Sequence, residues 1–273
     1  MTRIRFLLPC VLVVSAMPLS GQSVETARVQ HERADLRRHF ADHKATGTFV
    51  LYAVKADSCM RYNPERAKRR FLPASTFKIF NTMAALEAES IPDDTTILEW
   101  DGVERPVSGW NQDQDMRTAF RNSTVWFYQE LARRTGEDQL REMMEREHYG
   151  NASVSGGVDA FWLNGGLRIS ADEQVDFLVK LCRRALGFPV HAQGTVHRIM
   201  FLEERSGSTL RGKTGWTEQD GNQIGWFVGF VERKDEMYVY ALNLESPDPD
   251  FPMRNAREGI LRGILGELHL FEQ

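Results

Sequence analysis

A serine and a lysine stand three residues apart in the motif Ser75-x-x-Lys78. Residues 71–74 are typical of the end of a loop, and residues 79–89 have helical spacing and strong helix formers. Because positions i and i+3 share one helix face, the two side chains are expected to point the same way. A serine hydroxyl needs a base nearby to act as a nucleophile, and a helix N-terminus favours a developing oxyanion. The pair therefore suggests nucleophilic catalysis, although a serine N-cap followed by a surface lysine has the same pattern.

Further short motifs follow this pair in a definite order. They are Ser123-Thr124-Val125 at an expected helix start, Tyr149-Gly150-Asn151 after the next helix, and Lys213-Thr214-Gly215 at the end of an expected strand. Lys213 would supply a positive charge for a substrate carboxylate. Gly215 has no side chain and would let that substrate lie against the strand edge. For Tyr149-Gly150-Asn151 we favour a structural role as a helix stop.

Together and in this order, the motifs resemble those of the penicillin-recognising serine enzymes, which carry Ser-x-x-Lys, a serine-centred tripeptide and Lys-Thr-Gly. The second motif separates the classes within that superfamily. Class A β-lactamases and most transpeptidases have Ser-Asp-Asn, whereas this chain has Ser-Thr-Val. The deacylating glutamate of class A is also missing, because Ala160 occupies its place before Leu163-Asn164.

The pattern is instead similar to that of the class D β-lactamases, the oxacillinases. The resemblance rests on Ser-Thr-Phe-Lys, Ser-x-Val, Tyr-Gly-Asn, Phe-Trp-Leu at 161–163, the run 110–114 and the run 123–129. It extends from about residue 30 to the final helix, where Arg257 matches the arginine that binds the substrate carboxylate in this family. The chain is therefore identified as a member of that class.

The resemblance implies the chemistry of the site. Ser75 would attack the β-lactam carbonyl and form an acyl-enzyme. Lys78 in this family reacts with carbon dioxide, and the N-carboxylated side chain acts as the base in acylation and deacylation. Ser123 would relay protons to the leaving nitrogen, while Lys213 keeps the local potential positive. No metal or cofactor is expected beyond the carbon dioxide or bicarbonate that supplies the carbamate.

Carbamate formation has a physical requirement at Lys78. Only the neutral amine attacks carbon dioxide, whereas a free lysine has a pKa of ~10.4. Burial lowers a lysine pKa, and Phe77, Val125 and Trp162 are available to build an apolar pocket. The resulting anion needs hydrogen-bond donors, and the Trp162 indole N–H meets that need.

The resemblance also assigns substrate contacts. Thr214, Lys213 and Arg257 would hold the substrate carboxylate, the arginine through a bidentate contact. The backbone N–H groups of Ser75 and Trp216 would form the oxyanion hole. The expected substrate-binding residues are Val125, Thr214, Gly215, Trp216 and Arg257.

Hydrophobic periodicity predicts one compact catalytic unit, residues 23–273, with two lobes. The expected helices are 24–44, 76–89, 123–134, 138–147, 171–186, 195–203 and 255–270. The expected strands are 48–54, 59–62, 208–215, 223–232 and 236–244. Strands at both ends of the chain imply a mainly antiparallel sheet flanked by the terminal helices, with the middle helices inserted as a second lobe. The expected fold class is α+β, and the resemblance implies an α/β sandwich of the serine β-lactamase and transpeptidase type.

The N-terminus has the layout of a secretory signal peptide, approximately residues 1–22. Arg3 and Arg5 precede an apolar run, 6–17, that is too short to span a bilayer. We therefore expect an exported, periplasmic protein with no transmembrane segment in the mature chain. Its two remaining cysteines, Cys59 and Cys182, do not form a disulfide framework.

The composition is that of an ordinary soluble protein, with 273 residues, 42% hydrophobic and 26% charged. The net charge of −4 gives no indication of a nucleic-acid partner. We expect small-molecule β-lactams as the partners, and no feature of the sequence specifies an oligomeric state. His39 and His43 have the i, i+4 spacing of zinc ligands but no further ligand near them, so no metal site is predicted.

Two other functions fit the same motifs. One is a peptidoglycan transpeptidase or carboxypeptidase, although such enzymes usually carry membrane anchors or extra domains. The other is a β-lactam sensor domain, which is acylated by the drug but does not turn it over. Such sensors follow a multi-span membrane region, whereas this chain begins with an expected cleavable signal.

Overall fold

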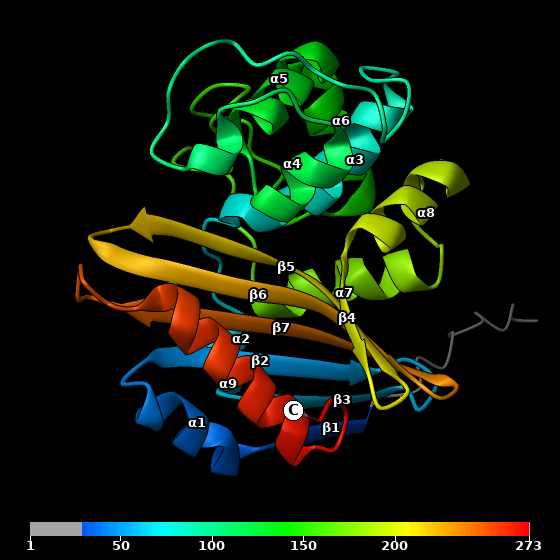
Figure 1. Cartoon of the computed structure of the whole chain (residues 1–273). Helices are drawn as coiled ribbons and strands as arrows, with labels where there is room; N and C mark the ends of the chain where they lie inside the picture. Colours follow the sequence, from blue (N-terminus) through cyan, green and yellow to red (C-terminus); the bar gives the residue numbers. More distant parts are fainter. Residues whose placement is uncertain (1–28, 273) are drawn as a thin grey trace, which may run out of the picture.

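One seven-stranded sheet, with strand order β1-β3-β2-β7-β6-β5-β4, forms the centre of the protein (Figure 1). The computed structural model describes residues 29–272, so the expected signal peptide at 1–22 lies outside the described residues. The strands are β1 (Val29–Glu32), β2 (Thr46–Ala53), β3 (Ser58–Tyr62), β4 (Phe201–Arg205), β5 (Ser208–Gln219), β6 (Asn222–Arg233) and β7 (Glu236–Ser246). All neighbouring pairs are antiparallel except β1 with β3. Because β2 pairs with β7, both ends of the chain build one sheet, as predicted.

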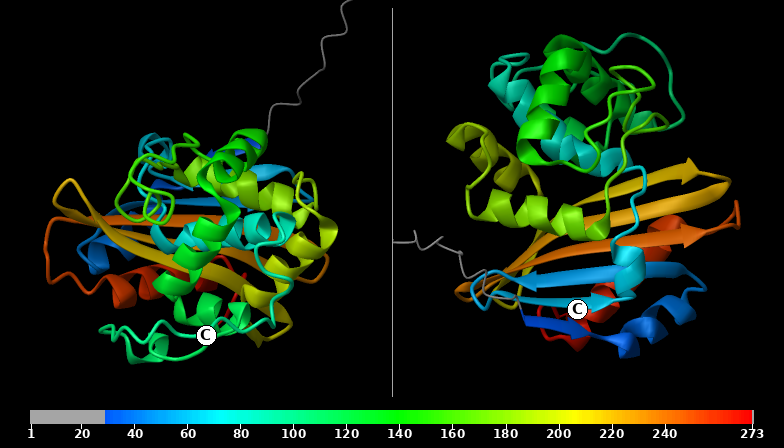
Figure 2. Two further views of the ribbon diagram at one scale, coloured as in Figure 1. Left: turned by 90° about the horizontal axis from the view of Figure 1, so that it is seen from above. Right: turned by 180° about the vertical axis from the view of Figure 1, so that it is seen from behind.

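The helices form two groups around the sheet (Figures 1 and 2). They are α1 (Arg37–Asp42), α2 (Pro64–Ala67), α3 (Lys78–Glu87), α4 (Met116–Asn122), α5 (Val125–Thr135), α6 (Glu137–Glu147), α7 (Ala171–Cys182), α8 (Val190–Ile199) and α9 (Met253–Glu267), with short 3-10 helices η1 (Ala34–Leu36), η2 (Ala74–Phe77) and η3 (Ser108–Trp110). α1 and α9 cover one face of the sheet. α3 to α6 form the separate helical lobe on the other side, and α7 lies between this lobe and the sheet. The predicted α+β fold with an inserted helical lobe is confirmed.

The sheet separates two hydrophobic cores, because successive side chains of a strand point to opposite faces. In β2, Phe49 and Leu51 belong to the core under α1 and α9, whereas Val50 and Tyr52 belong to the core shared with the helical lobe. This second core continues through α3, where nine of the ten residues are buried. The active-site helix is therefore held by apolar packing on nearly all sides.

Two short edge strands contradict the sequence-based prediction. The predicted helix over 24–44 is wrong at β1, Val29–Glu32, and only η1 and α1, up to Asp42, are helical within it. The predicted helix over 195–203 is confirmed up to Ile199 but has wrong bounds, because α8 begins at Val190 and the chain becomes β4 at Phe201. β1 pairs with β3, and β4 pairs with β5. Long-range pairing sets these edges and overrides the helical periodicity.

A helix that the periodicity did not indicate carries one wall of the cleft. α4 begins after Asp115, whose side chain accepts a hydrogen bond from the Thr118 backbone N–H at 2.8 Å. Ser123 ends this helix in a left-handed conformation with φ +56°, and α5 starts two residues later. Ser123 therefore lies in the link between two helices, whereas the sequence predicted that it starts one.

Two further structural results concern the membrane and the cysteines. Within residues 29–272 no helix has both the length and the apolar character needed to cross a bilayer. No disulfide joins Cys59 and Cys182; Cys59 is buried and Cys182 is half-buried.

Candidate active site

Ser75 and Lys78 lie where η2 passes into α3, at the cleft between the helical lobe and the sheet. The Lys78 Nζ donates a hydrogen bond to the Ser75 Oγ at 2.9 Å. Ser75 is partly exposed, whereas Lys78 is completely buried. The predicted nucleophile and base are thus in contact, with the nucleophile on the open side.

The segment that precedes Ser75 is held by two neighbours across the cleft. Ala74 has φ +49°, a conformation that residues with a side chain seldom adopt. Its backbone N–H donates to the Trp162 carbonyl at 3.0 Å, which fixes the segment to the loop that carries Trp162. On the other side a Cβ added to Gly215 would lie 2.8 Å from the Pro73 carbonyl oxygen. Position 215 therefore requires glycine for a reason that the sequence did not suggest, because only glycine lets β5 approach the loop that carries the nucleophile.

Burial prepares Lys78 for chemistry. The Lys78 Nζ lies 5.2 Å from the centre of the Tyr128 ring, and the ring of Phe77, the preceding residue, stacks on Trp162 at 5.2 Å. Burial disfavours the ammonium form and lowers the pKa of Lys78 from 10.5 to about 7. A substantial neutral fraction therefore exists near neutral pH. A neutral amine can accept the serine proton or react with carbon dioxide.

Ser123, in the link between α4 and α5, and Lys213, on β5, form a second hydroxyl–amine pair that joins the helical lobe to the sheet. The Lys213 Nζ donates to the Ser123 Oγ at 3.0 Å and to the Thr214 carbonyl at 3.1 Å. Burial, followed by the positive charges of Lys78 and Arg257, holds the pKa of Lys213 well below its usual value. An arriving carboxylate would favour the charged form again. The pair can therefore exchange a proton and also hold an anion.

The expected carboxylate-binding residues meet at the free side of β5. Arg257 on α9 donates from Nη1 to the Gly215 carbonyl at 2.8 Å, and Lys213 and Thr214 are neighbours on the strand. Burial, and then Arg254, lowers the pKa of Arg257 to about 10, so it stays charged at neutral pH. Two cations and a hydroxyl, brought to one place by β5 and α9, suit a carboxylate.

The remaining predicted residues come from α5, from the loop before α7 and from β5. Val125 starts α5 and is half-buried, and Trp162 is buried in the aromatic cluster with Phe77 and Phe161. Trp216 is 55% exposed, and its indole N–H donates to the Gln223 side chain at 2.9 Å. This bond turns the ring along the sheet, while the backbone of Trp216 continues β5 beyond Gly215.

Tyr149-Gly150-Asn151 has the contacts of a structural motif. The Tyr149 ring packs on Phe80 at 5.0 Å and on Phe177 at 4.9 Å. Gly150 has φ +57°, and an added Cβ would lie 2.1 Å from the Arg168 carbonyl oxygen. The Asn151 side chain donates to the Gly166 carbonyl and accepts from the Arg168 N–H. The motif fixes the loop that contains Trp162, in agreement with the predicted structural role.

Two residues that the sequence did not single out also position the site. Tyr128 faces Lys78, and its position three residues after Val125 on α5 could have indicated this. Thr217 donates from Oγ1 to the Leu163 carbonyl at 2.7 Å and so joins β5 to the Trp162 loop. Its alternation with Gly215 along the strand is too common a pattern to have identified it.

The two histidines considered as zinc ligands face α9. The His39 Nε2 lies 2.6 Å from a Glu267 carboxylate oxygen, and His43 approaches the backbone at Gly259. Across residues 29–272 no three His, Cys, Asp or Glu side chains are grouped so that they could hold a metal ion.

A serine beside a buried lysine, a second serine–lysine pair and a cationic strand edge, on this fold, define a penicillin-recognising serine enzyme. Residues 39–266 match the penicillin binding protein transpeptidase domain family. The β-lactamase OXA-20 of Pseudomonas aeruginosa is 42% identical over 86% of this chain and 87% of its own length. The crystal structure of a class D β-lactamase from Nostoc superposes with a TM-score of 0.83 at 39% identity, over 86% of this chain and 99% of that one.

A regulatory protein is also related. BlaR1 of Bacillus licheniformis is 36% identical over 85% of this chain, a region that makes up 38% of that longer protein. The β-lactamases match this chain at higher identity, and over a larger share of their own length, than BlaR1 does. The chain belongs to the class D β-lactamases, which are enzymes of the penicillin-binding transpeptidase-domain family.

Proposed function

We propose that this protein hydrolyses β-lactam antibiotics through an acyl-enzyme on Ser75, with N-carboxylated Lys78 as the base for both steps, and so confers resistance. The observation that carries the proposal is the fully buried Lys78 amine, 2.9 Å from the Ser75 hydroxyl and with its pKa lowered to about 7. Relatives named as β-lactamases, at 42% identity, support the same substrate class.

The proposed reaction begins before substrate arrives. The neutral Lys78 nitrogen attacks carbon dioxide, a C–N bond forms, and the ammonium proton leaves to water, which gives a carbamate anion. The carbamate removes the Ser75 proton as the serine oxygen attacks the lactam carbonyl and the C–N bond of the ring breaks. The carbamic acid gives this proton up through Ser123 to the leaving nitrogen, which restores the carbamate. The carbamate then takes a proton from the water that attacks the ester carbonyl, and that proton returns to the Ser75 oxygen as the ester bond breaks. Trp162 would donate its indole N–H to the carbamate.

The substrate would be held at the sheet side of the cleft. Thr214, Lys213 and Arg257 would bind its carboxylate, and the backbone N–H groups of Ser75 and Trp216 would bind the carbonyl oxygen. Removal of one such oxyanion donor costs on the order of 10²–10³ in rate. Gly215 and Val125 would contact the bound substrate from opposite walls.

The test is turnover of benzylpenicillin by purified protein, with and without added bicarbonate. We expect sustained hydrolysis that rises with bicarbonate and falls in mildly acidic buffer, because both conditions control the carbamate. Electrospray mass spectrometry of the intact protein would detect the acyl-enzyme. A flat response to bicarbonate and pH would contradict the carbamate mechanism, even if the hydrolysis itself is observed.

A second function, β-lactam sensing, is favoured by the similarity to BlaR1. A sensor would give one stoichiometric acylation of Ser75 without steady-state turnover. The same measurement therefore separates the two functions.

Export to the periplasm depends on residues 1–22 and stays a prediction. Expression of the full chain in a Gram-negative host should give periplasmic activity, a processed N-terminus near residue 23, and a raised inhibitory concentration of penicillin. An unprocessed chain that remains in the cytoplasm would contradict it.

A further inference from the structure

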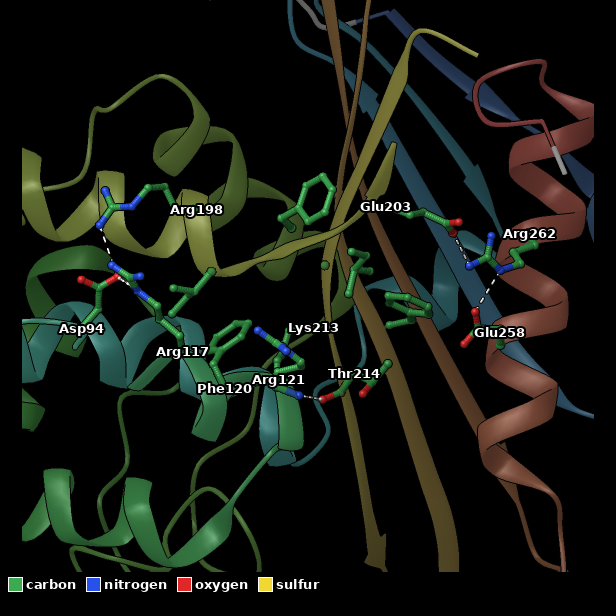
Figure 3. Close-up of a pocket in the computed structure, with 15 residues that line it drawn as sticks. Asp94, Arg117, Phe120, Arg121, Arg198, Glu203, Lys213, Thr214, Glu258 and Arg262 are labelled. Atoms are coloured by element: carbon green, nitrogen blue, oxygen red, sulfur yellow. Dashed lines mark hydrogen bonds and ion pairs between the residues drawn. The ribbon is translucent and has the colours of Figure 1, made fainter. Parts of the chain in front are cut away.

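A cavity of about 700 Å³ opens beside the catalytic cleft, with Lys213 and Thr214 as the shared wall (Figure 3). It exists because β4 covers only part of β5: the pairing ends at Phe201 with Arg211. The Gly212 backbone N–H still donates to the Met200 carbonyl at 2.8 Å, and beyond it α4, α8 and α9 border the space beside β5. Ser75 is not among the residues that line this cavity.

The charges around the cavity leave an excess of positive charge. Its acidic side chains are already paired: Asp94 accepts from Arg117 at 2.8 Å and Arg198 at 3.4 Å, and Glu203 and Glu258 both bind Arg262. Arg121, at the last turn of α4, is exposed and has no side-chain partner among the described residues. Figure 3 places it at the Lys213 and Thr214 end of the cavity. An anionic group entering there would meet an arginine that no carboxylate neutralises.

The rest of the wall is apolar. Phe120, Ile199 and Phe227 line the cavity, and Phe201 and Leu202 at its rim are 49% and 46% exposed. Side chains of this kind favour hydrocarbon over water. The cavity therefore suits a small group that is part hydrocarbon and ends in an anion.

The proposed substrate binding mode directs one part of a cephalosporin to this cavity. In a cephalosporin the carboxylate is on ring carbon C4, the C3 substituent is on the adjacent carbon, and the acyl side chain is on C7 of the lactam ring. If Lys213, Thr214 and Arg257 hold the carboxylate, C3 lies beside the shared wall. The C7 side chain leaves in the opposite direction.

We propose that this cavity is the subsite for the C3 substituent of cephalosporins, and that Arg121 makes it selective for anionic substituents. The inference rests on the proposed function, since that function places the substrate carboxylate. It adds a substrate preference and a specificity-determining residue that the motifs do not contain.

The test compares two cephalosporins that share one C7 side chain. One carries a neutral propenyl group at C3, and the other a carboxyethenyl group of nearly the same shape. Benzylpenicillin, which has no such substituent, is the reference substrate. The variants are Arg121→Gln and, as a matched control, Arg37→Gln, which removes an exposed arginine from α1 on the far side of the sheet.

We expect Arg121→Gln to lower kcat/KM for the carboxyethenyl compound about two- to fivefold, mainly through KM, which is the range for a solvent-exposed ion pair. The propenyl compound and benzylpenicillin should be unchanged, and Arg37→Gln should have no effect on any of them. High salt should remove the wild-type preference, because exposed charges are screened. Arg121→Glu should reverse the preference.

Two results would overturn the subsite. One is an equal loss on all three substrates, which would place Arg121 in recognition of the shared carboxylate. The other is no change with any substrate. If the wild-type protein is acylated but does not turn over, the proposed function fails, and the same ratios are measured as second-order acylation rate constants. The subsite is therefore tested in either case.

Discussion

The two walls of the cleft each bury a lysine next to a serine, but they bury it in different surroundings. On the helical wall, Lys78 is fully buried and faces the Tyr128 ring, and burial alone lowers its pKa. On the sheet wall, Lys213 also lies near two other cations and borders an open cavity. The first environment favours a neutral amine. The second attracts an anion, because the positive charges there are uncompensated until substrate arrives.

This difference indicates how one fold uses the same residue type twice. In the proposed function, the buried surroundings of Lys78 make it a reactive base, whereas the cations at the edge of β5 make Lys213 part of the substrate-binding site. Exchanging the two surroundings would remove both functions. Each of the following predictions tests one side of this comparison.

The largest effect is expected at the helical wall. Lys78→Ala removes the base of both steps, so kcat for benzylpenicillin should fall ~10²–10⁴-fold, and the acyl-enzyme should persist if it forms. Steady-state kinetics and intact-protein mass spectrometry would measure this. Lys68→Ala, at a lysine that is 63% exposed, is the control. Turnover close to that of the wild type in Lys78→Ala would show that the buried amine is not the base.

A smaller loss is expected at the sheet wall. Lys213→Ala removes a charged hydrogen-bond donor, which contributes about 1.5–3 kcal/mol, so kcat/KM for benzylpenicillin should fall ~10–100-fold. The methyl ester of benzylpenicillin has no carboxylate and should lose much less. If kcat/KM falls by the same factor for the ester and the acid, Lys213 acts on Ser123 rather than on the substrate carboxylate. The lysines of the two walls would then not differ in the way proposed.

The smallest effect should depend on conditions. Trp162→Phe keeps an aromatic ring beside Phe77 but removes the indole N–H, so the proposed carbamate loses a donor. At limiting bicarbonate we expect about a tenfold fall in kcat, with the acidic side of the pH profile moved upward, because a less stable carbamate is lost at higher pH. Saturating bicarbonate should restore activity. A loss that bicarbonate does not restore would indicate a packing defect instead.

The motifs could be predicted because each one is local in the sequence, whereas the contacts that hold them in place could not. Ser75 and Lys78 meet through the i, i+3 geometry of a helix start, which follows directly from their spacing in the sequence. The strained φ of Ala74 and its bond to the Trp162 carbonyl join segments almost ninety positions apart, and no periodicity encodes such a contact. Ser123 was placed at a helix start since α4 is only seven residues long and depends on its Asp115 cap.

The sheet was predicted in outline and missed at both edges. A long strand such as β6 is predictable from a nearly continuous run of buried residues, because both of its faces pack against a core. β1 and β4 have four and five residues and gain stability only from a partner strand. The missed β4 matters for function, since the point where it ends creates the cavity that Arg121 borders.

The burial of Lys78 also has a consequence for folding stability. Its pKa is about 7 in the folded, uncarboxylated protein and 10.5 in the unfolded chain. Above pH 10.5 the amine is neutral in both states and costs nothing. As the pH falls toward 7, only the unfolded chain takes up the proton, so the folded state loses stability, and below 7 the full penalty remains. The reactive amine therefore makes the enzyme less stable than its packing alone would allow, most of all in neutral and acidic conditions.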